Sequence, residues 1–113
     1  MSIPHVKSGQ VINLEDRVET IETGHSRALV KTDDFEAMLM LLSNGQALPE
    51  HAVTGPFTVQ CLRGEARFSI NDQPRQLTPG DWLFVDTGLP YAVEAKSDCS
   101  LLITVVFAEG THA

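Results

Sequence analysis

The chain contains few basic residues and few cysteines. Its 113 residues include eight Lys and Arg against 15 Asp and Glu, which gives a formal net charge of -7. Nucleic acids require a basic face, and anionic membrane surfaces attract clusters of Lys and Arg, so this balance disfavours both partners. The two cysteines, Cys61 and Cys99, are too few for a disulfide framework. Both lie in apolar segments, and we expect them to be buried as small hydrophobic residues.

Long apolar runs are also absent. The longest, from Leu101 to Ala108, is interrupted by Thr104 and is far shorter than the ~20 residues that span a bilayer. Residues 1–5 lack the apolar core of a signal peptide, which leads us to expect a cytoplasmic protein. No P-loop, dinucleotide-binding fingerprint or Gly-x-Ser-x-Gly elbow occurs, so the sequence offers no support for nucleophilic catalysis.

Turn residues divide the chain at short intervals, which is typical of an all-β sandwich or barrel. Between the turns we expect strands at residues 26–32, 35–42, 57–62, 66–70, 75–77, 82–85, 91–95 and 100–107. Arg63-Gly64-Glu65 predicts a hairpin between two of them. No segment combines a sustained 3.6-residue apolar period with helix caps, so residues 6–32 are interpreted as N-terminal strands.

Residues 35–42 are the most ambiguous segment. The run from Met38 to Leu42 consists of good helix formers, so intrinsic propensity alone favours a helix. The segment is short, however, and Ser43-Asn44-Gly45 stops it at once. Because strand-like segments lie on both sides, we predict a strand that is covered on both faces.

Glycines and turns in residues 35–107 resemble the two motifs of the cupin superfamily. The first, G-(x)5-H-x-H-(x)3,4-E-(x)6-G, is matched by Gly45, His51 and Gly64. The second, G-(x)5-P-x-G-(x)2-H-(x)3-N, is matched by Gly80, Gly88 and the turn Leu89-Pro90-Tyr91. The length suits one domain over residues 1–113. The resemblance implies that this domain is an antiparallel jelly-roll barrel (double-stranded β-helix) of the RmlC-like, cupin-2 type, often found as a homodimer.

The metal ligands of the motif are mostly missing. In metal-binding cupins, three histidines and a glutamate hold a divalent transition metal. The resemblance places the first histidine on His51, the second on Val53 and the third on Tyr91, and the glutamate on Phe57 or, with a longer loop, on Thr58. A catalytic metal site usually needs about three protein ligands, and Val and Phe have no lone pair to donate. We therefore interpret the metal motif as degenerate and expect no cofactor.

Six residues are candidates for lining a pocket in the barrel. They occupy motif positions or lie on the adjacent strands: His51, Val53, Phe57, Gln60, Tyr91 and Trp82. The alternative to a metal-free pocket is a weak site for a divalent transition metal at His51, Gln60 and Tyr91. The sequence does not determine which face of its strand Gln60 occupies.

Three hypotheses for function remain. The first is a small-molecule binding module that lacks the full cupin metal set. The second is an enzyme: the resemblance implies either isomerase or epimerase chemistry, with His51 and Tyr91 as acid and base, or a metal-dependent dioxygenase. The third is a structural homodimer, in which residues 6–14 add a strand to the sheet edge of a partner.

Overall fold

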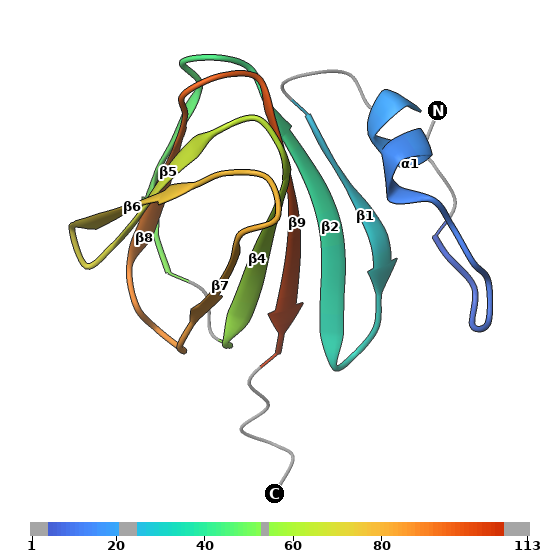
Figure 1. Cartoon of the computed structure of the whole chain (residues 1–113). Coiled ribbons are helices and arrows are strands. Elements are labelled where there is room, and N and C mark those ends of the chain that lie inside the picture. The colour runs from blue at the N-terminus through green and yellow to red at the C-terminus, as the bar shows by residue number, and fades with distance from the viewer. Residues whose placement is uncertain (1–4, 21–24, 53–54, 108–113) are drawn as a thin grey trace, which may run out of the picture.

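The computed structural model describes residues 5–20, 25–52 and 55–107 (Figure 1). The described elements are one helix and nine strands: α1 (Leu14–Thr20), β1 (Ser26–Lys31), β2 (Phe35–Leu42), β3 (Ala47–His51), β4 (Phe57–Arg63), β5 (Ala66–Ile70), β6 (Gln73–Leu77), β7 (Trp82–Val85), β8 (Tyr91–Ala95) and β9 (Cys99–Val106). Within these residues, no helix is long and apolar enough to cross a bilayer.

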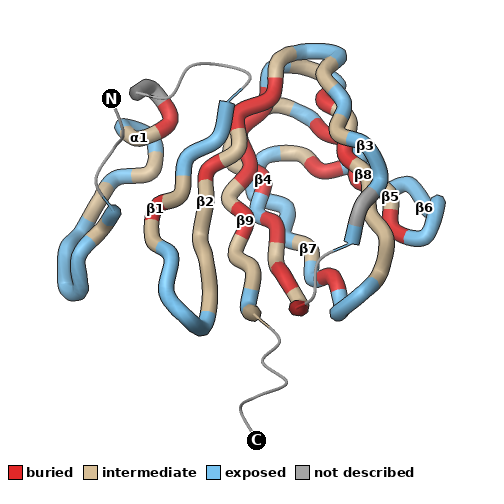
Figure 2. The backbone as a smooth tube through the Cα atoms, turned by 180° about the vertical axis from the view of Figure 1, so that it is seen from behind, coloured by how far each residue is buried: buried red, intermediate tan, exposed pale blue. Residues whose placement is uncertain are grey.

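The strands form two antiparallel sheets that face each other (Figure 1). The five-stranded sheet has the order β1-β2-β9-β4-β7, and the four-stranded sheet has the order β3-β8-β5-β6. After β2, every connection except β5–β6 carries the chain from one sheet to the other. This is the jelly-roll arrangement, and the predicted all-β class is confirmed. Most of the buried hydrophobic residues form one core cluster with members from both sheets, and buried residues appear as red segments in Figure 2.

The predicted hairpin at Arg63-Gly64-Glu65 is wrong. β4 pairs with β7 and β9, whereas β5 pairs with β6 and β8, so this turn connects the two sheets. Gly64 adopts a φ of +72°, and a Cβ on it would lie 2.1 Å from the carbonyl oxygen of Asp98. The turn is therefore shaped by close packing against the β8–β9 turn. The two-residue hairpin lies instead at Asn71-Asp72, where both φ angles are positive, as a type I′ turn requires.

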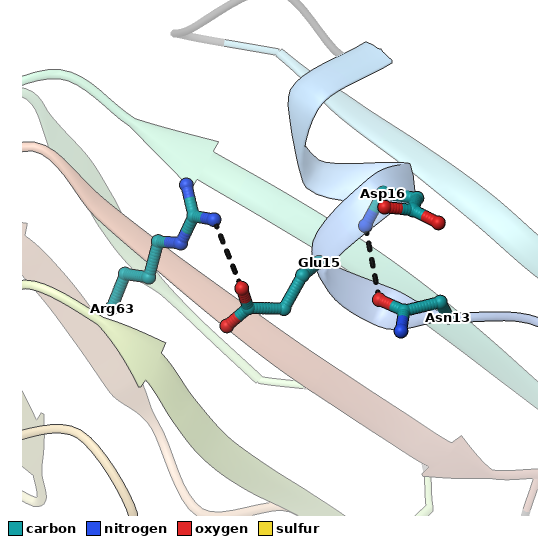
Figure 3. Close-up of polar contacts among 4 residues, drawn as sticks. All are labelled: Asn13, Glu15, Asp16 and Arg63. Atoms are coloured by element: carbon teal, nitrogen blue, oxygen red, sulfur yellow. Dashed lines mark hydrogen bonds and ion pairs between the residues drawn. The ribbon is translucent and has the colours of Figure 1, made fainter.

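The N-terminal region contains the helix α1 in place of one of the predicted strands, whereas the strand at residues 26–31 is confirmed. Asn13 begins the helix, because the Asp16 N–H donates to its Oδ1 at 3.2 Å (Figure 3). The Arg17 N–H also donates to the carbonyl oxygen of Asn13 at 3.2 Å. Glu15 and Asp16 place negative charge in the first turn, where the helix dipole favours it. Seven residues are too few to display a helical period, which explains the incorrect prediction.

The outer face of the five-stranded sheet is partly covered by this region. Leu39 and Leu41 of β2 pack there with Val18 of α1 and Leu29 of β1. The Val6 N–H donates to the carbonyl oxygen of Leu29, so the chain at Val6 lies beside β1 of the same molecule. A 3.4 Å ion pair joins Glu15 of α1 to Arg63 of β4 (Figure 3).

β2 is covered on both faces, as predicted. Its odd-numbered leucines contact the outer cluster, while Met38, Met40 and Leu42 belong to the core between the sheets. A strand with two buried faces carries apolar residues at consecutive positions instead of alternating ones. This explains why the sequence of β2 resembles that of a helix.

β3 was not predicted as a strand, because it contains Pro49. Proline cannot donate a hydrogen bond to a neighbouring strand, and within sheets it is found mainly at edges and bulges. β3 is an edge strand, and its pairing with β8 shifts register between Leu48 and His51.

Three turns close one end of the space between the sheets, the upper end in Figure 1. The Asn44 N–H donates to Asp98 Oδ1 at 2.7 Å, and the Glu65 N–H donates to Ser97 Oγ at 3.0 Å. Cys61 and Cys99 are buried in the core beside these turns as free thiols, which confirms their predicted role. The candidate site lies at the opposite end, where β2, β4 and β8 begin and β9 ends.

Candidate functional site

A cavity of about 620 Å³ lies between the sheets at the end where β2, β4 and β8 begin and β9 ends. Side chains on alternate positions of these strands face inward, because successive residues of a strand point to opposite faces. The described lining residues come from both sheets and their flanking loops: Glu36, Met38, Met40, Leu48, Pro49, Ala52, Phe57, Tyr91, Ile103, Val105 and Phe107. The wall is therefore mainly apolar.

Aromatic rings pack together beside the cavity. The ring of Tyr91 stacks on that of Phe68 with a centroid distance of 5.3 Å and an interplanar angle of 4°. The ring of Phe57 lies 4.9 Å from that of Tyr91 at an angle of 54°. Phe68 is completely buried, so it provides a fixed support for Tyr91. Two rings thus face the cavity from opposite sheets, one from β4 and one from β8.

The described part of the cavity wall carries very little charge. Glu36 is the one charged side chain among the described lining residues, and its carboxylate makes no hydrogen bond or ion pair with another described residue. Burial raises the pKa of the Tyr91 phenol above its usual value, so the hydroxyl is neutral at physiological pH. The site therefore combines an apolar wall, a neutral phenol and one carboxylate.

The structure brings together two of the six predicted pocket residues, Phe57 and Tyr91. Gln60 is exposed on β4 and pairs with Trp82 of β7, a residue that is 62% exposed. Both residues are absent from the described lining, because they alternate with the inward-facing positions of their strands. The backbone of His51 pairs with that of Tyr91, but the side chain of His51 and the whole of Val53 lie outside the described part.

Several lining residues are not among the six pocket candidates that the sequence offered. Glu36, Met38 and Met40 lie at alternate positions of β2, which is the expected spacing for one face of a strand. The continuous apolar run in β2 conceals which alternate set faces inward. Val105 and Phe107 repeat the same spacing at the end of β9.

The described residues do not fit a cupin metal centre. Among them, no group of three or more His, Cys, Asp or Glu side chains is placed to hold an ion. The alternative site at His51, Gln60 and Tyr91 is not assembled, since Gln60 and Tyr91 differ in face: one is exposed on β4 and the other lines the cavity. The raised pKa of Tyr91 also disfavours the phenolate that a metal would need.

No family model matches the sequence, and no curated protein is similar to it in sequence. Solved structures are similar in fold. A conserved protein of unknown function from Streptococcus pyogenes is 24% identical, with a TM-score of 0.80 and coverage of 97% of each chain. A cupin superfamily protein from Desulfitobacterium hafniense is 22% identical, with a TM-score of 0.80 over 96% of this chain and 100% of the other. A cupin-2 domain containing protein from Shewanella frigidimarina is 18% identical, with a TM-score of 0.74 over 85% and 94%.

Proposed function

We propose that this chain, which has the cupin fold, binds a small apolar molecule in the cavity between its two sheets. The observation that carries the proposal is the cavity itself. Its volume of about 620 Å³ lies in the range of small-ligand sites, roughly 300–1,000 Å³. Such sites are mostly apolar and contain a few polar groups that orient the ligand. The described wall has this composition, with Tyr91 and Glu36 as the polar groups.

The closed end of the molecule supports a preformed site. Hydrogen bonds between turns hold the two sheets together there, including the bond from the Asn44 N–H to Asp98. Tyr91 is held against the fully buried Phe68. A ligand therefore enters a pocket whose walls are already in place, which limits the entropy lost on binding.

The proposal is tested with the neutral apolar dye N-phenyl-1-naphthylamine, whose fluorescence rises in an apolar environment. The wild-type protein is expected to bind it saturably. Val105→Phe adds a ring inside the cavity, and we expect binding to weaken at least about tenfold, a loss of about 1.4 kcal/mol. Thr104→Phe is the matched control, because adjacent strand residues point to opposite faces and Thr104 is not among the described lining residues.

Two results would contradict the proposal. One is the absence of saturable dye binding to the folded wild-type protein. The other is equal binding by the Val105→Phe and Thr104→Phe variants, which would place the dye outside the cavity. Far-UV circular dichroism on both variants establishes that each remains folded.

A second candidate function is acid–base catalysis on the bound molecule. It is supported by the backbone pairing of His51 with Tyr91, because Tyr91 lines the cavity and the two predicted acid–base residues lie on adjacent strands. General acid–base catalysis requires both groups within hydrogen-bond reach of the substrate. Once a ligand is identified, an enzyme of this kind will catalyse exchange of a ligand C–H proton in deuterium oxide. Tyr91→Phe will slow that exchange while retaining binding; exchange at the rate of the free ligand excludes this function.

A further inference from the structure

The charges around the cavity restrict which ligands it accepts. Three of the eight basic residues, Arg67, Arg75 and Lys96, lie together around a separate groove on the four-stranded sheet. None of the described cavity-lining residues is basic. An anionic ligand placed in this cavity would lose hydration and gain no opposite charge from these residues, which is costly. The described wall therefore selects against carboxylate and phosphate groups.

Glu36 favours a ligand that carries a positive charge. It lies on β2 at the same face as Met38 and Met40, near the end where β9 finishes. Lys31 of β1 is its cross-strand neighbour, but the Glu36 carboxylate makes no hydrogen bond or ion pair with a described residue, so its acceptor sites remain available to a ligand. A carboxylate at the rim of an apolar cavity forms its strongest hydrogen bonds with charged donors such as an ammonium group. The net charge of -7 also favours the approach of cations.

The remaining wall suits the apolar part of the same ligand. The rings of Phe57 and Tyr91 and the thioethers of Met38 and Met40 offer polarisable surface. Aromatic faces attract cations as well as apolar groups, and methionine adapts to irregular shapes. A compact molecule with an apolar body and one amine thus matches every described part of the wall.

We propose that the cavity is selective for compact apolar amines, with the protonated amine at Glu36 and the apolar body against Phe57, Tyr91 and the two methionines. This inference rests on the proposed binding function and specifies its ligand class. It predicts that neutral or acidic molecules of the same size bind more weakly than amines.

The test uses three probes that share one apolar body and differ in charge: 2-phenylethylamine, 2-phenylethanol and 3-phenylpropanoate. Binding is followed at neutral pH by NMR of ¹³C-methyl methionine. Two of the three methionines, Met38 and Met40, line the cavity, so their methyl signals report on occupancy. We expect the amine to bind about tenfold more tightly than the alcohol, and the carboxylate to bind most weakly.

Two charge-neutralising variants complete the test. Glu36→Gln is expected to bring the affinity for the amine down to that for the alcohol, because glutamine retains the size of the side chain but not its negative charge. Asp16→Asn on α1 removes the same charge from an exposed position that is not among the described lining residues, and is expected to retain the preference. Retained preference in the first variant, or loss in both, would overturn the role of Glu36.

The other outcomes separate the inference from the proposed function. If all three probes shift the methyl signals with equal affinity, or if the carboxylate binds best, the amine selectivity is refuted and the cavity remains a small-molecule site. If no probe shifts these signals up to its solubility limit and the dye also fails to bind, both proposals are refuted.

Discussion

The contact between the Gly64 turn and the β8–β9 turn leads to a quantitative prediction for Gly64→Ala. Gly64 has a φ of +72°, and an L-residue in this region costs about 1–2 kcal/mol. The added Cβ would also lie 2.1 Å from the backbone oxygen of Asp98, so that turn has to move. Movement disrupts the hydrogen bond from the Glu65 N–H to Ser97, which contributes about 1 kcal/mol. We expect the free energy of unfolding to fall by roughly 2–3 kcal/mol.

Gly45→Ala isolates the conformational part of this effect. Gly45 has a similar φ of +86°, but a Cβ on it would meet no heavy atom within 4 Å beyond its neighbours in the chain. This variant is expected to lose only about 1–2 kcal/mol. Urea denaturation followed by far-UV circular dichroism measures both values. If Gly64→Ala lowers the free energy of unfolding no more than Gly45→Ala does, the β8–β9 turn moves aside at no cost. The contact between the two turns then does not hold this end of the fold closed.

Three further predictions concern the helix, the thiols and metal content. Asn13→Ala should lower the free energy of unfolding by about 1 kcal/mol in urea melts, whereas Asn13→Asp, which keeps a capping oxygen, should not. Burial raises the pKa of Cys61, and that of Cys99 to about 11, so Ellman's reagent should label neither thiol of the native protein at neutral pH; immediate labelling contradicts their burial. In the folded protein the pKa of each thiol lies above its ordinary value of 9.0. The contribution of the protonated thiols to the free energy of unfolding is therefore fully present below pH 9.0 and should decline as the pH rises toward 11. Protein purified without added metal should contain less than one equivalent by elemental analysis, and a chelator should leave its melting temperature unchanged; one ion per chain that a chelator removes with loss of stability contradicts the degenerate motif.

Local sequence signals predicted most strands correctly. Residues 35–42 illustrate this, because Ser43-Asn44-Gly45 ends an apolar run too short for a typical helix, and the segment is β2. The same local approach did not identify β3, since Pro49 conceals an edge strand. It also did not identify α1, where a single capping residue, Asn13, was the available signal.

The sequence does not reveal which face of each strand points into the cavity, and this limited the prediction of the site. Phe57 and Gln60 lie three residues apart on β4, so they occupy opposite faces, and only Phe57 is among the described cavity-lining residues. The motif resemblance pointed to Phe57 and Tyr91 but not to Glu36, the one charged group of the described wall. Glu36 belongs to no motif position, and its role depends on the strands that β2 contacts.

The amino-acid sequence by itself determined the alternation of short strands and turns, because turn residues and strand propensities act within a few residues of each other. Tertiary structure decided which strands pair: β2 lies beside β9, at the far end of the chain, and the Gly64 turn joins two sheets. It also decided which residues surround the cavity. Those outcomes depend on contacts between distant segments, whose free energy exists only once both sheets are formed.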